Sequence, residues 1–261
     1  MKVVILAGGL GTRMREETEF RPKPMVDIGG KPVLWHIMKL FSHHGHNEFV
    51  VLTGYKSEVV KEYFFNYQLN NHDITLNLGD RQSVIFHGPE EESDWKVSVI
   101  HTGLDAPTGE RLLRAREHIG NETFLCTYGD SVSDVNVSDL VRHHQNWGGV
   151  ATLTSTRPTG RFGVLDVSDD GVVHDFKEKP ELADVINIGY FVFEPTVFEY
   201  LNFGMALEEA PLANLARSGE LSSYHHSGFW QPMDTYREYK ILNSLWNSGE
   251  APWASWKRPH A

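Results

Sequence analysis

Strand-like and helix-like segments alternate along this chain from its first residues, and this alternation constrains the fold more than any other feature. In the first half, the predicted strands are Lys2–Ala7, Phe49–Thr53, Lys96–His101 and Thr123–Thr127. The predicted helices are Val33–Phe41, a segment capped by Ser57 that runs to Phe64, and about Glu110–Ile119. Repeated strand–helix units place strands parallel with helices on both faces. The sequence therefore predicts an α/β fold with a doubly wound, mostly parallel, Rossmann-like mixed sheet.

In the second half of the chain, four predicted strands follow one another without an intervening helix. They are Val150–Thr156, Phe162–Val167, Val172–Lys177 and Ile186–Phe193. The middle two flank Asp169-Asp170-Gly171, which indicates a hairpin. Short helices are expected after Pro195 and Pro211, and a final helix at Tyr236–Trp246. No Ser/Pro-rich linker or internal repeat separates the halves, so we expect residues 1–261 to form a single domain.

Charge and composition limit which binding partners and which cellular compartment are expected for this protein. A formal net charge of -11 over 261 residues argues against attraction to a nucleic-acid backbone. Cys126 is the single cysteine, so no internal disulfide is possible, and we expect it to be a core residue of a cytoplasmic protein. The apolar run in Lys2–Ala7 is too short to cross a membrane, so no membrane partner is expected. Three tryptophans near the C-terminus are expected to pack on the body or on another subunit, which favours a homo-oligomer: Trp246, Trp253 and Trp256.

A glycine-rich loop follows the first predicted strand. In Leu6-Ala7-Gly8-Gly9-Leu10-Gly11-Thr12-Arg13, the glycines let the backbone approach phosphates and point N–H groups at them. The dinucleotide-binding fingerprint needs a third glycine where this chain has Met14, and the Walker loop needs a Gly-Lys-Ser/Thr ending. Both classes are disfavoured, and the loop is either another kind of phosphate site or a simple turn.

Lys23 lies between Pro22 and Pro24, ten residues after Arg13. Each proline fixes its own φ and biases its predecessor towards extended geometry, so the lysine is held on a stiff backbone. A stiffly held ammonium suits a triphosphate, whose developing negative charge must be met without reorganisation. Alone, such a residue is more often a surface lysine, and the glycine-rich loop makes the functional interpretation the better one.

The two motifs together resemble the signature of the sugar-1-phosphate nucleotidyltransferase family, in Ala7-Gly8-Gly9-Leu10-Gly11-Thr12-Arg13 followed by Lys23-Pro24-Met25. Other segments resemble its glucose-1-phosphate cytidylyltransferase branch: Pro32-Val33-Leu34-Trp35-His36-Ile37-Met38, Thr108-Gly109-Glu110-Arg111-Leu112, Gly160-Arg161-Phe162-Gly163 and Gly228-Phe229-Trp230-Gln231-Pro232-Met233-Asp234-Thr235. The resemblance runs almost end to end. It implies an enzyme with the nucleotidyltransferase fold, in which about residues 1–148 bind nucleotide, about 149–235 bind the sugar phosphate, and about 236–261 form a C-terminal helix and tail.

The resemblance also implies roles for particular residues. The expected catalytic residues are Arg13, Lys23, Asp130 and Asp234, with Mg²⁺ as cofactor on Asp130 and Asp234. The expected nucleotide-binding residues are Leu6, Ala7, Gly8, Gly9, Leu10, Gly11, Thr12, Arg13, Lys23, Thr108, Arg111 and Gly129. The expected sugar-phosphate-binding residues are Gly163, Glu178, Lys179, Asn187 and Gly189. Ile188 stands where the family usually has a small residue, which leaves the fit of the sugar open.

The expected reaction is in-line attack of a glucose 1-phosphate oxygen on the α-phosphorus of CTP, giving CDP-glucose and pyrophosphate. The sugar phosphate is already anionic near neutral pH, so positioning and charge neutralisation supply the rate without a general base. Arg111 is the candidate cytosine reader, because cytosine offers O2 and N3 as two acceptors to a forked guanidinium. Glu110 either contacts cytosine N4 or points to solvent.

Two alternatives stay open. The same chemistry could use UTP, dTTP or another sugar 1-phosphate. A protein of another class, a catalytically silent nucleotide- or sugar-binding regulator, would be expected to lose a metal carboxylate or the phosphate lysine. Retention of five key residues favours an enzyme: Arg13, Lys23, Asp130, Lys179 and Asp234. The pathway that the family implies is dideoxysugar synthesis for lipopolysaccharide O-antigen.

Overall fold

The protein is described as a computed structural model that covers residues 1–89, 91–160, 162–181 and 183–257. At residues 13, 15, 16 and 80–82 the description is limited to the backbone. A seven-stranded sheet forms the centre, in the order β14-β10-β13-β8-β1-β4-β7. Its strands are β1 (Val3–Ala7), β4 (Glu48–Thr53), β7 (Lys96–His101), β8 (Phe124–Tyr128), β10 (Ala151–Thr156), β13 (Ile186–Phe193) and β14 (Leu221–His225).

The sheet is mostly parallel, as predicted. β1 pairs in parallel with β4 on one side and with β8 on the other, and β10 pairs in parallel with β14. β13 runs antiparallel to both of its neighbours, β10 and β8. Strands from both halves of the chain therefore meet in one mixed sheet, and the predicted fold class is confirmed.

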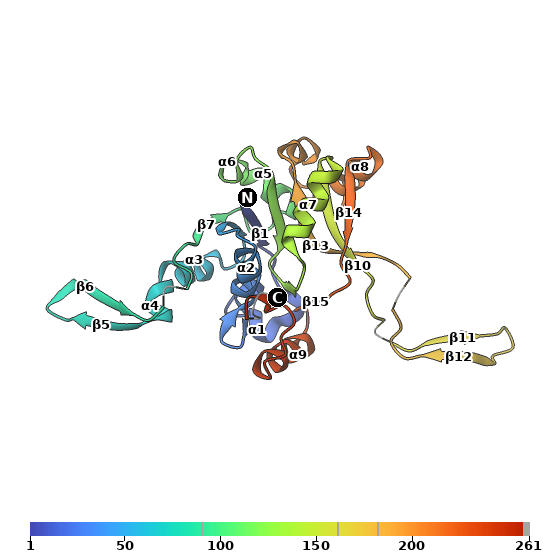
Figure 1. Ribbon diagram of the computed structural model, residues 1–261, viewed down its shortest axis with the longest axis horizontal. Helices are drawn as coiled ribbons and strands as arrows, with labels where there is room; N and C mark the ends of the chain where they lie inside the picture. The colour runs from blue at the N-terminus through green and yellow to red at the C-terminus, as the bar shows by residue number, and fades with distance from the viewer. Residues whose placement is uncertain (90, 161, 182, 258–261) are drawn as a thin grey trace.

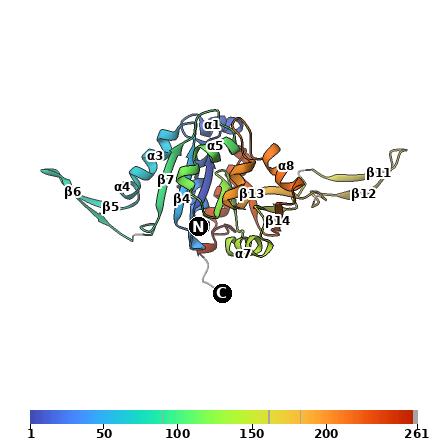
Figure 2. The ribbon, with the colours of Figure 1, turned by 90° about the horizontal axis from the view of Figure 1, so that it is seen from above.

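Helices cover both faces of this sheet. Successive side chains of a strand point to opposite faces, so Val3, Ile5 and Ala7 enter one core while Val4 and Leu6 enter the other. The first core is closed by α2 (Val33–His43), α3 (Ser57–Phe65) and α7 (Val137–Trp147). The second core is closed by α5 (Thr108–Arg114), α6 (Arg116–Ile119) and α8 (Ala210–Arg217). Figure 2 shows α7 and α8 on opposite sides of the sheet.

Two helix predictions need correction. Ser57 does not cap α3, because the N-cap is Lys56 in a left-handed conformation (φ 49°) and the Ser57 hydroxyl lies 2.7 Å from the Thr53 hydroxyl. The predicted helix at Glu110–Ile119 starts earlier, at Thr108, and is divided at Ala115 into α5 and α6. The helix expected after Pro195 is a 3-10 helix, η3 (Pro195–Tyr200), and Pro211 lies in the first turn of α8.

Smaller elements surround the sheet. On the N-terminal side these are η1 (Thr12–Met14), α1 (Arg15–Thr18), η2 (Lys23–Met25), β2 (Asp27–Ile28), β3 (Lys31–Pro32) and α4 (Tyr67–Asn71). Later in the chain they are β9 (Ser131–Ser133), β15 (Trp230–Pro232), α9 (Tyr236–Asn247) and η4 (Ser255–Lys257). Among the described residues, no helix is long and apolar enough to span a bilayer.

Two antiparallel hairpins project from opposite sides of the body (Figures 1 and 2). The hairpin of β11 (Val164–Val167) and β12 (Val173–Lys177) was predicted and is confirmed. The hairpin of β5 (Asp73–Asn77) and β6 (Asp80–His87) was missed by our sequence analysis. We refer to the β5–β6 hairpin as the first ribbon, and to the β11–β12 hairpin together with its flanking residues Gly163, Glu178 and Lys179 as the second ribbon.

The C-terminal tail packs on its own chain. Trp253 is 1% exposed, stacks on Phe229 and Trp246, and donates its indole N–H to Nδ1 of His36 at 3.3 Å. Burial lowers the pKa of His36 to about 4, so this ring is neutral at pH 7. Of the two positions expected for the tryptophans, the structure therefore supports packing on the body. Cys126 is fully buried in β8, as predicted.

Candidate active site

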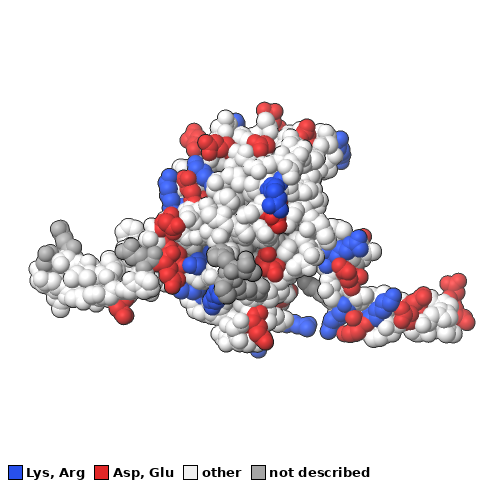
Figure 3. Space-filling view, viewed as in Figure 1, with Lys and Arg blue, Asp and Glu red and all other residues white. Residues whose placement is uncertain are grey.

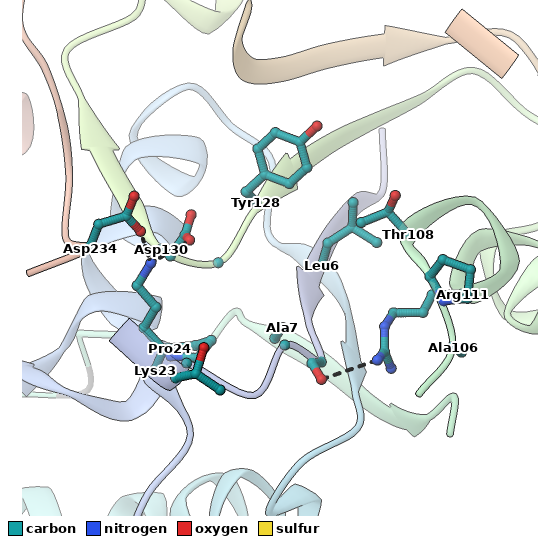
Figure 4. A pocket seen from close by; sticks show the side chains of 16 residues that line it. Leu6, Ala7, Lys23, Pro24, Ala106, Thr108, Arg111, Tyr128, Asp130 and Asp234 are labelled. Carbon is teal, nitrogen blue, oxygen red and sulfur yellow. Dashed lines mark hydrogen bonds and ion pairs between the residues drawn. The ribbon is translucent and has the colours of Figure 1, made fainter. Parts of the chain in front are cut away.

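A pocket of about 320 Å³ opens at the carboxyl ends of β1 and β8, the edge where open α/β sheets bind ligands (Figure 4). It is lined by Leu6, Ala7, Gly8, Gly9, Gly11, Thr12, Lys23, Pro24, Ala106, Pro107, Thr108, Arg111, Tyr128, Gly129, Asp130 and Asp234. Nearly all the residues predicted to bind nucleotide are in this set. Leu10 is about half exposed and does not line the pocket, and the side chain of Arg13 lies outside the described part of the structure.

Arg111 lines one end of the pocket and is buried, with 4% of the residue exposed. Its Nη2 donates to the carbonyls of Gly8 and Leu104, both at 3.1 Å. Its Nη1 donates to the Gly103 carbonyl at 2.7 Å and to the Thr102 hydroxyl at 2.8 Å. A Cβ at Gly8 would overlap this guanidinium, so a side chain at the first glycine of the loop would displace Arg111. Arg111 therefore ties α5 to the loop after β1.

These carbonyl partners explain how a charged side chain is tolerated in this place. Burial lowers the pKa of Arg111, and the neighbouring charge of Arg114 lowers it further. Arginine keeps its proton in proteins even so, and the carbonyl dipoles around the guanidinium stabilise that charge. Both terminal nitrogens are committed to protein oxygens in this state, a detail that the sequence alone did not indicate.

Lys23 departs from the extended geometry that the following Pro24 favours, and its backbone is held instead by a helical turn. It begins the 3-10 helix η2, in which Met25 N–H donates to the Pro22 carbonyl at 2.8 Å and Val26 N–H donates to the Lys23 carbonyl at 3.1 Å. Pro24 and Met25 are buried and anchor the turn. The Lys23 side chain is only 12% exposed, so its ammonium reaches the pocket from a fixed backbone.

Asp130 and Asp234 are brought together by a short strand pair. Asp130 comes directly before β9, and Asp234 follows β15 after one residue. The antiparallel pairing of β9 with β15 and the hydrogen bond from Met233 N–H to the Asp130 carbonyl, at 2.8 Å, place the two carboxylates side by side. The capping box of α9 holds Asp234 from the other side, because Glu238 accepts from Asp234 N–H at 2.7 Å.

Both carboxylates converge on the Lys23 ammonium. Lys23 Nζ is 2.7 Å from Asp130 Oδ2 and also donates to Asp234 Oδ1. Figure 4 shows this group at one end of the pocket and Thr108 and Arg111 at the other. A point where two carboxylates already hold a positive charge is chemically suited to a cation. The site fits Mg²⁺, which is usually bound by one or two carboxylates together with substrate phosphates.

Tyr128 and Thr108 face each other across the pocket mouth and share one acceptor, Glu208. Thr108 Oγ1 donates to Glu208 Oε2 at 2.6 Å, and the Tyr128 hydroxyl donates to Oε1 of the same carboxylate. Burial, followed by the negative charge of Glu208, raises the pKa of Tyr128 far above its ordinary value. Tyr128 therefore remains a hydrogen-bond donor. Glu208 lies in an irregular loop before α8 and was missed in our sequence analysis.

Glu208→Gln should raise the KM for substrates about tenfold while kcat falls less, because a glutamine side chain offers only one acceptor oxygen for the two hydroxyls. Steady-state kinetics with each substrate varied in turn measures this split. Glu209→Gln, the same change at the next residue of the loop, is the matched control and should leave KM unchanged. Equal KM values for both variants would show that Glu208 does not position the pocket residues.

Glu110 takes neither of the two orientations expected from the sequence. Its carboxylate accepts from Gly204 N–H at 2.8 Å and pairs with Arg114 at 2.5 Å. The hydrogen bond from Gly204 lowers the pKa of Glu110, and the bond from Arg114 lowers it further. Glu110 therefore fastens the 201–209 loop, which carries Glu208, to α5.

Asn187 and Gly189 lie on β13, beside Tyr128 of the neighbouring strand β8. Asn187 Oδ1 accepts from Gly189 N–H at 2.9 Å, and Gly189 has a φ of 83°. A Cβ at Gly189 would overlap the Tyr128 ring, so glycine is needed there on both counts. Ile188, whose role was open, points the other way into the first core and is 2% exposed.

The other three predicted sugar-phosphate residues lie on the second ribbon. Gly163 precedes β11, and Glu178 and Lys179 follow β12. The Glu178 and Lys179 side chains are 60% and 50% exposed, and their charged groups lie 3.3 Å apart. None of the three lines the pocket. The structure thus brings together the nucleotide and metal candidates, whereas none of the five predicted sugar-phosphate residues lines the pocket and only Asn187 and Gly189 adjoin it, beside Tyr128.

The comparison with protein families agrees with this geometry. A model of the nucleotidyl transferase family matches residues 2–215 of this chain. The chain therefore belongs to the nucleotidyl transferase family, and the family resemblance inferred from the sequence is confirmed.

Individual relatives narrow the family further. The glucose-1-phosphate cytidylyltransferases of Salmonella typhi and of Salmonella typhimurium (strain LT2) are each 47% identical to this chain, over 98% of it and all of those proteins. Among solved structures, UDP-glucose pyrophosphorylase complexed with UDP-glucose superposes with a TM-score of 0.69 at 18% identity, over 95% of this chain and 98% of that one. The structural likeness establishes the shared fold, and the sequence likeness points to the glucose-1-phosphate cytidylyltransferase branch of the family.

Proposed function

We propose that this chain transfers a cytidylyl group from CTP to α-D-glucose 1-phosphate, giving CDP-glucose and pyrophosphate. The observation that carries this proposal is the pocket itself, in which Lys23 lies between Asp130 and Asp234 at one end and Arg111 and Thr108 lie at the other. That arrangement suits a triphosphate at the charged end and a base at the far end. The two Salmonella relatives support the choice of CTP and glucose 1-phosphate.

The chain's own residues act by positioning and by charge. Backbone N–H groups of the loop from Gly8 to Thr12 bind phosphate oxygens, and Lys23 neutralises the charge that builds up as pyrophosphate leaves. Arg13 adds a second positive charge on the leaving phosphates. An oxygen of the sugar phosphate attacks the α-phosphorus directly, and no residue has to remove a proton. Asp130 and Asp234 would hold Mg²⁺, which neutralises charge on the phosphates when it is bound.

Lys179 binds the phosphate of glucose 1-phosphate in this proposal, and Glu178 accepts hydrogen bonds from sugar hydroxyls. Asn187, Gly189 and Gly163 complete the contacts with the sugar. The position of Asn187 and Gly189 beside Tyr128, at the edge of the pocket, supports their part of the assignment.

Arg111 selects cytosine by exchanging carbonyl partners for O2 and N3 of the base. Arg111→Ala should lower the ratio of kcat/KM for CTP to that for UTP about tenfold or more. It should also lower the free energy of unfolding by about 3 kcal/mol, because buried carbonyls lose a charged donor. Kinetics with both triphosphates and chemical denaturation measure the two effects. Arg114→Ala is the matched control one turn later, with no expected change in the ratio.

An Arg111→Ala protein that is less stable but equally selective would show that Arg111 only supports the loop. Its bonds to the Gly8, Gly103 and Leu104 carbonyls favour that alternative as a second candidate, in which base choice is looser and UTP or dTTP is also used.

Three further features belong to the proposal. Residues 1–261 act as one domain with a nucleotide-binding and a sugar-phosphate-binding half. A single, buried cysteine supports a place in the cytoplasm. The functional protein is a homo-oligomer, supported by the exposed apolar side chains of the projecting hairpins, such as Leu78 and Phe176.

The deciding experiment measures pyrophosphate release from the purified protein with Mg²⁺ and glucose 1-phosphate, with CTP, UTP, dTTP, ATP or GTP supplied in turn. We expect release with CTP and little with the others. Similar rates with UTP or dTTP would keep the reaction class and remove the account of base choice. No release with any triphosphate or sugar phosphate would favour a silent binding protein.

A further inference from the structure

The two proposed metal carboxylates depend on a very short strand pair for their position. β9 and β15 have three residues each, and their register pairs Trp230 with Ser133 and Pro232 with Ser131. Proline has no N–H to donate to a partner strand, so the backbone of this pair can form few hydrogen bonds. A slip of one residue would move Asp234 by about 3.3 Å and turn each side chain of the strand to the opposite face. The backbone pairing alone is therefore a weak constraint on the register.

Asp134, the residue directly after β9, adds a stronger constraint. Its Oδ1 accepts the Phe229 N–H at 2.7 Å, and its own N–H donates to the Phe229 carbonyl at 3.2 Å. The Ser133 hydroxyl donates to the same carbonyl at 2.7 Å. Phe229 directly precedes β15, so these three hydrogen bonds fix the point at which β15 begins to pair with β9.

His226 joins this group to the central sheet. Its ring Nε2 is 3.1 Å from Asp134 Oδ1 and 3.2 Å from the Phe229 carbonyl oxygen. A carboxylate and a carbonyl are both acceptors, so Nε2 is the ring nitrogen that carries the proton. The backbone N–H of His226 donates to the Ser155 carbonyl of β10 at 2.8 Å. The buried ring therefore connects the seven-stranded sheet to the strand pair that carries the carboxylates.

The turn from His226 to Phe229 is closed so tightly that Gly228 has no room for a side chain. A Cβ there would lie 2.5 Å from Asp134 Oδ1 and 2.7 Å from the His226 ring. These two groups are the ones that interact with each other, so a larger residue at position 228 would push them apart.

We infer that Asp134 and His226 are positioning residues for the proposed metal site, because they fix the register of β15 on β9 and thereby hold the Asp234 carboxylate beside Asp130. Figure 4 shows these two carboxylates next to each other at one end of the pocket. Asp134 and His226 do not line that pocket, so they act through the strand pair and not on the substrate. The inference rests on the proposed function for the metal role of Asp234.

Amide hydrogen exchange tests the register directly and needs no activity. The Met233 N–H donates to the Asp130 carbonyl at 2.8 Å, so its protection reports whether β15 stays paired with β9. Asp134→Ala should make this amide exchange about tenfold faster, because the variant lacks the acceptor for Phe229 and His226. His226→Ala should change the exchange in the same direction. Unchanged protection of Met233 in both variants would overturn the inference.

Kinetics test the consequence for the metal site. Asp134→Ala should lower kcat about tenfold and raise the Mg²⁺ concentration that gives half-maximal rate about tenfold, because a displaced carboxylate binds the metal less well. Asp134→Asn keeps an acceptor oxygen in the same place and should retain at least about half of the wild-type kcat. His226→Gln, whose amide N–H can replace that of Nε2, should likewise be more active than His226→Ala. Wild-type kcat and Mg²⁺ dependence in both alanine variants would contradict the inference.

A double-mutant cycle separates positioning from a general loss of structure. In the Asp234→Asn background, Asp134→Ala should lower kcat less than about twofold, since the carboxylate that it positions is already absent. An equal loss in both backgrounds would show that Asp134 does not act through Asp234. If circular dichroism shows that Asp134→Ala is unfolded, His226→Ala takes its place in the cycle. A silent wild-type protein would refute the proposed function, and the exchange of the Met233 amide would then decide the register alone.

Two exposed residues provide matched controls. His225→Ala removes the neighbouring ring, and Glu117→Ala removes one carboxylate from α6. Figure 3 shows Asp and Glu spread over several parts of the visible face with Lys and Arg among them, so the loss of one exposed carboxylate changes the surface charge little. Both controls should keep the wild-type kcat and the wild-type exchange of Met233. A loss in Glu117→Ala equal to that in Asp134→Ala would reveal an effect of net charge and would refute positioning.

Discussion

Asp234→Asn should lower kcat about 100- to 1000-fold and leave the fold intact. Asp234 and Asp130 converge on one cation position, and Asn keeps the shape of the side chain while it removes half of the negative charge there. The backbone around position 234 is fixed independently of the carboxylate, by the bond from Asp234 N–H to Glu238 and by the strand pair β9–β15. The loss should therefore appear in turnover and in Mg²⁺ binding but not in thermal unfolding.

Three measurements check this expectation. They are pyrophosphate release at saturating substrates, the Mg²⁺ concentration that gives half-maximal rate, and the unfolding temperature. Asp139→Asn is the matched control, because Asp139 lies on the surface of α7 and pairs with Arg142 at 2.6 Å. A near-normal kcat for Asp234→Asn would remove Asp234 from the metal site.

Lys23→Met should lower turnover and, at the same time, tighten the binding of Mg²⁺ to the protein. Turnover should fall about 100-fold, because the variant lacks the positive charge that stabilises the leaving pyrophosphate. Binding of Mg²⁺ to the protein without nucleotide should become at least about tenfold tighter. The reason is that the Lys23 ammonium now occupies the space between the two carboxylates, so a divalent cation must displace it.

Calorimetric titration with Mg²⁺ in the absence of nucleotide measures the second effect, and the pyrophosphate assay measures the first. Lys240→Met on the exposed side of α9 is the control for removing one positive charge from the whole chain. Equal Mg²⁺ affinity in wild type and Lys23→Met would show that the ammonium and the metal do not compete for one position.

Much of the fold was predictable from sequence because its central strands are short apolar runs between clear helical patterns. The predicted limits of β7 and β13 agree with the structure at both ends. The β5–β6 hairpin was missed although Ile74 and Leu76 alternate with polar residues, a pattern that could have revealed it. β9 and β15 have three residues each, too few for any periodicity to register.

Site residues could be predicted where they form a motif with their neighbours in sequence. They could not be predicted where their role depends on contacts between residues far apart in the chain. Lys23 between its two prolines, and the glycine loop, could be interpreted from neighbours in sequence. The bond between Arg111 and the Gly8 carbonyl joins residues 103 positions apart, and no local pattern indicates it. Glu208 was invisible for the same reason, since its partners Thr108 and Tyr128 lie 100 and 80 positions away.

The distances in sequence between Lys23 and its two carboxylates also determine when the site can form during synthesis. Lys23 is 107 residues from Asp130 and 211 residues from Asp234. Contacts of such high sequence separation form late in folding, because long loops must close before they can contribute. A growing chain on the ribosome therefore completes its glycine loop and first carboxylate long before the second one exists. With the metal role proposed for Asp234, a chain that stops at β15 lacks one of the two carboxylates around Lys23 and would not turn over nucleotide.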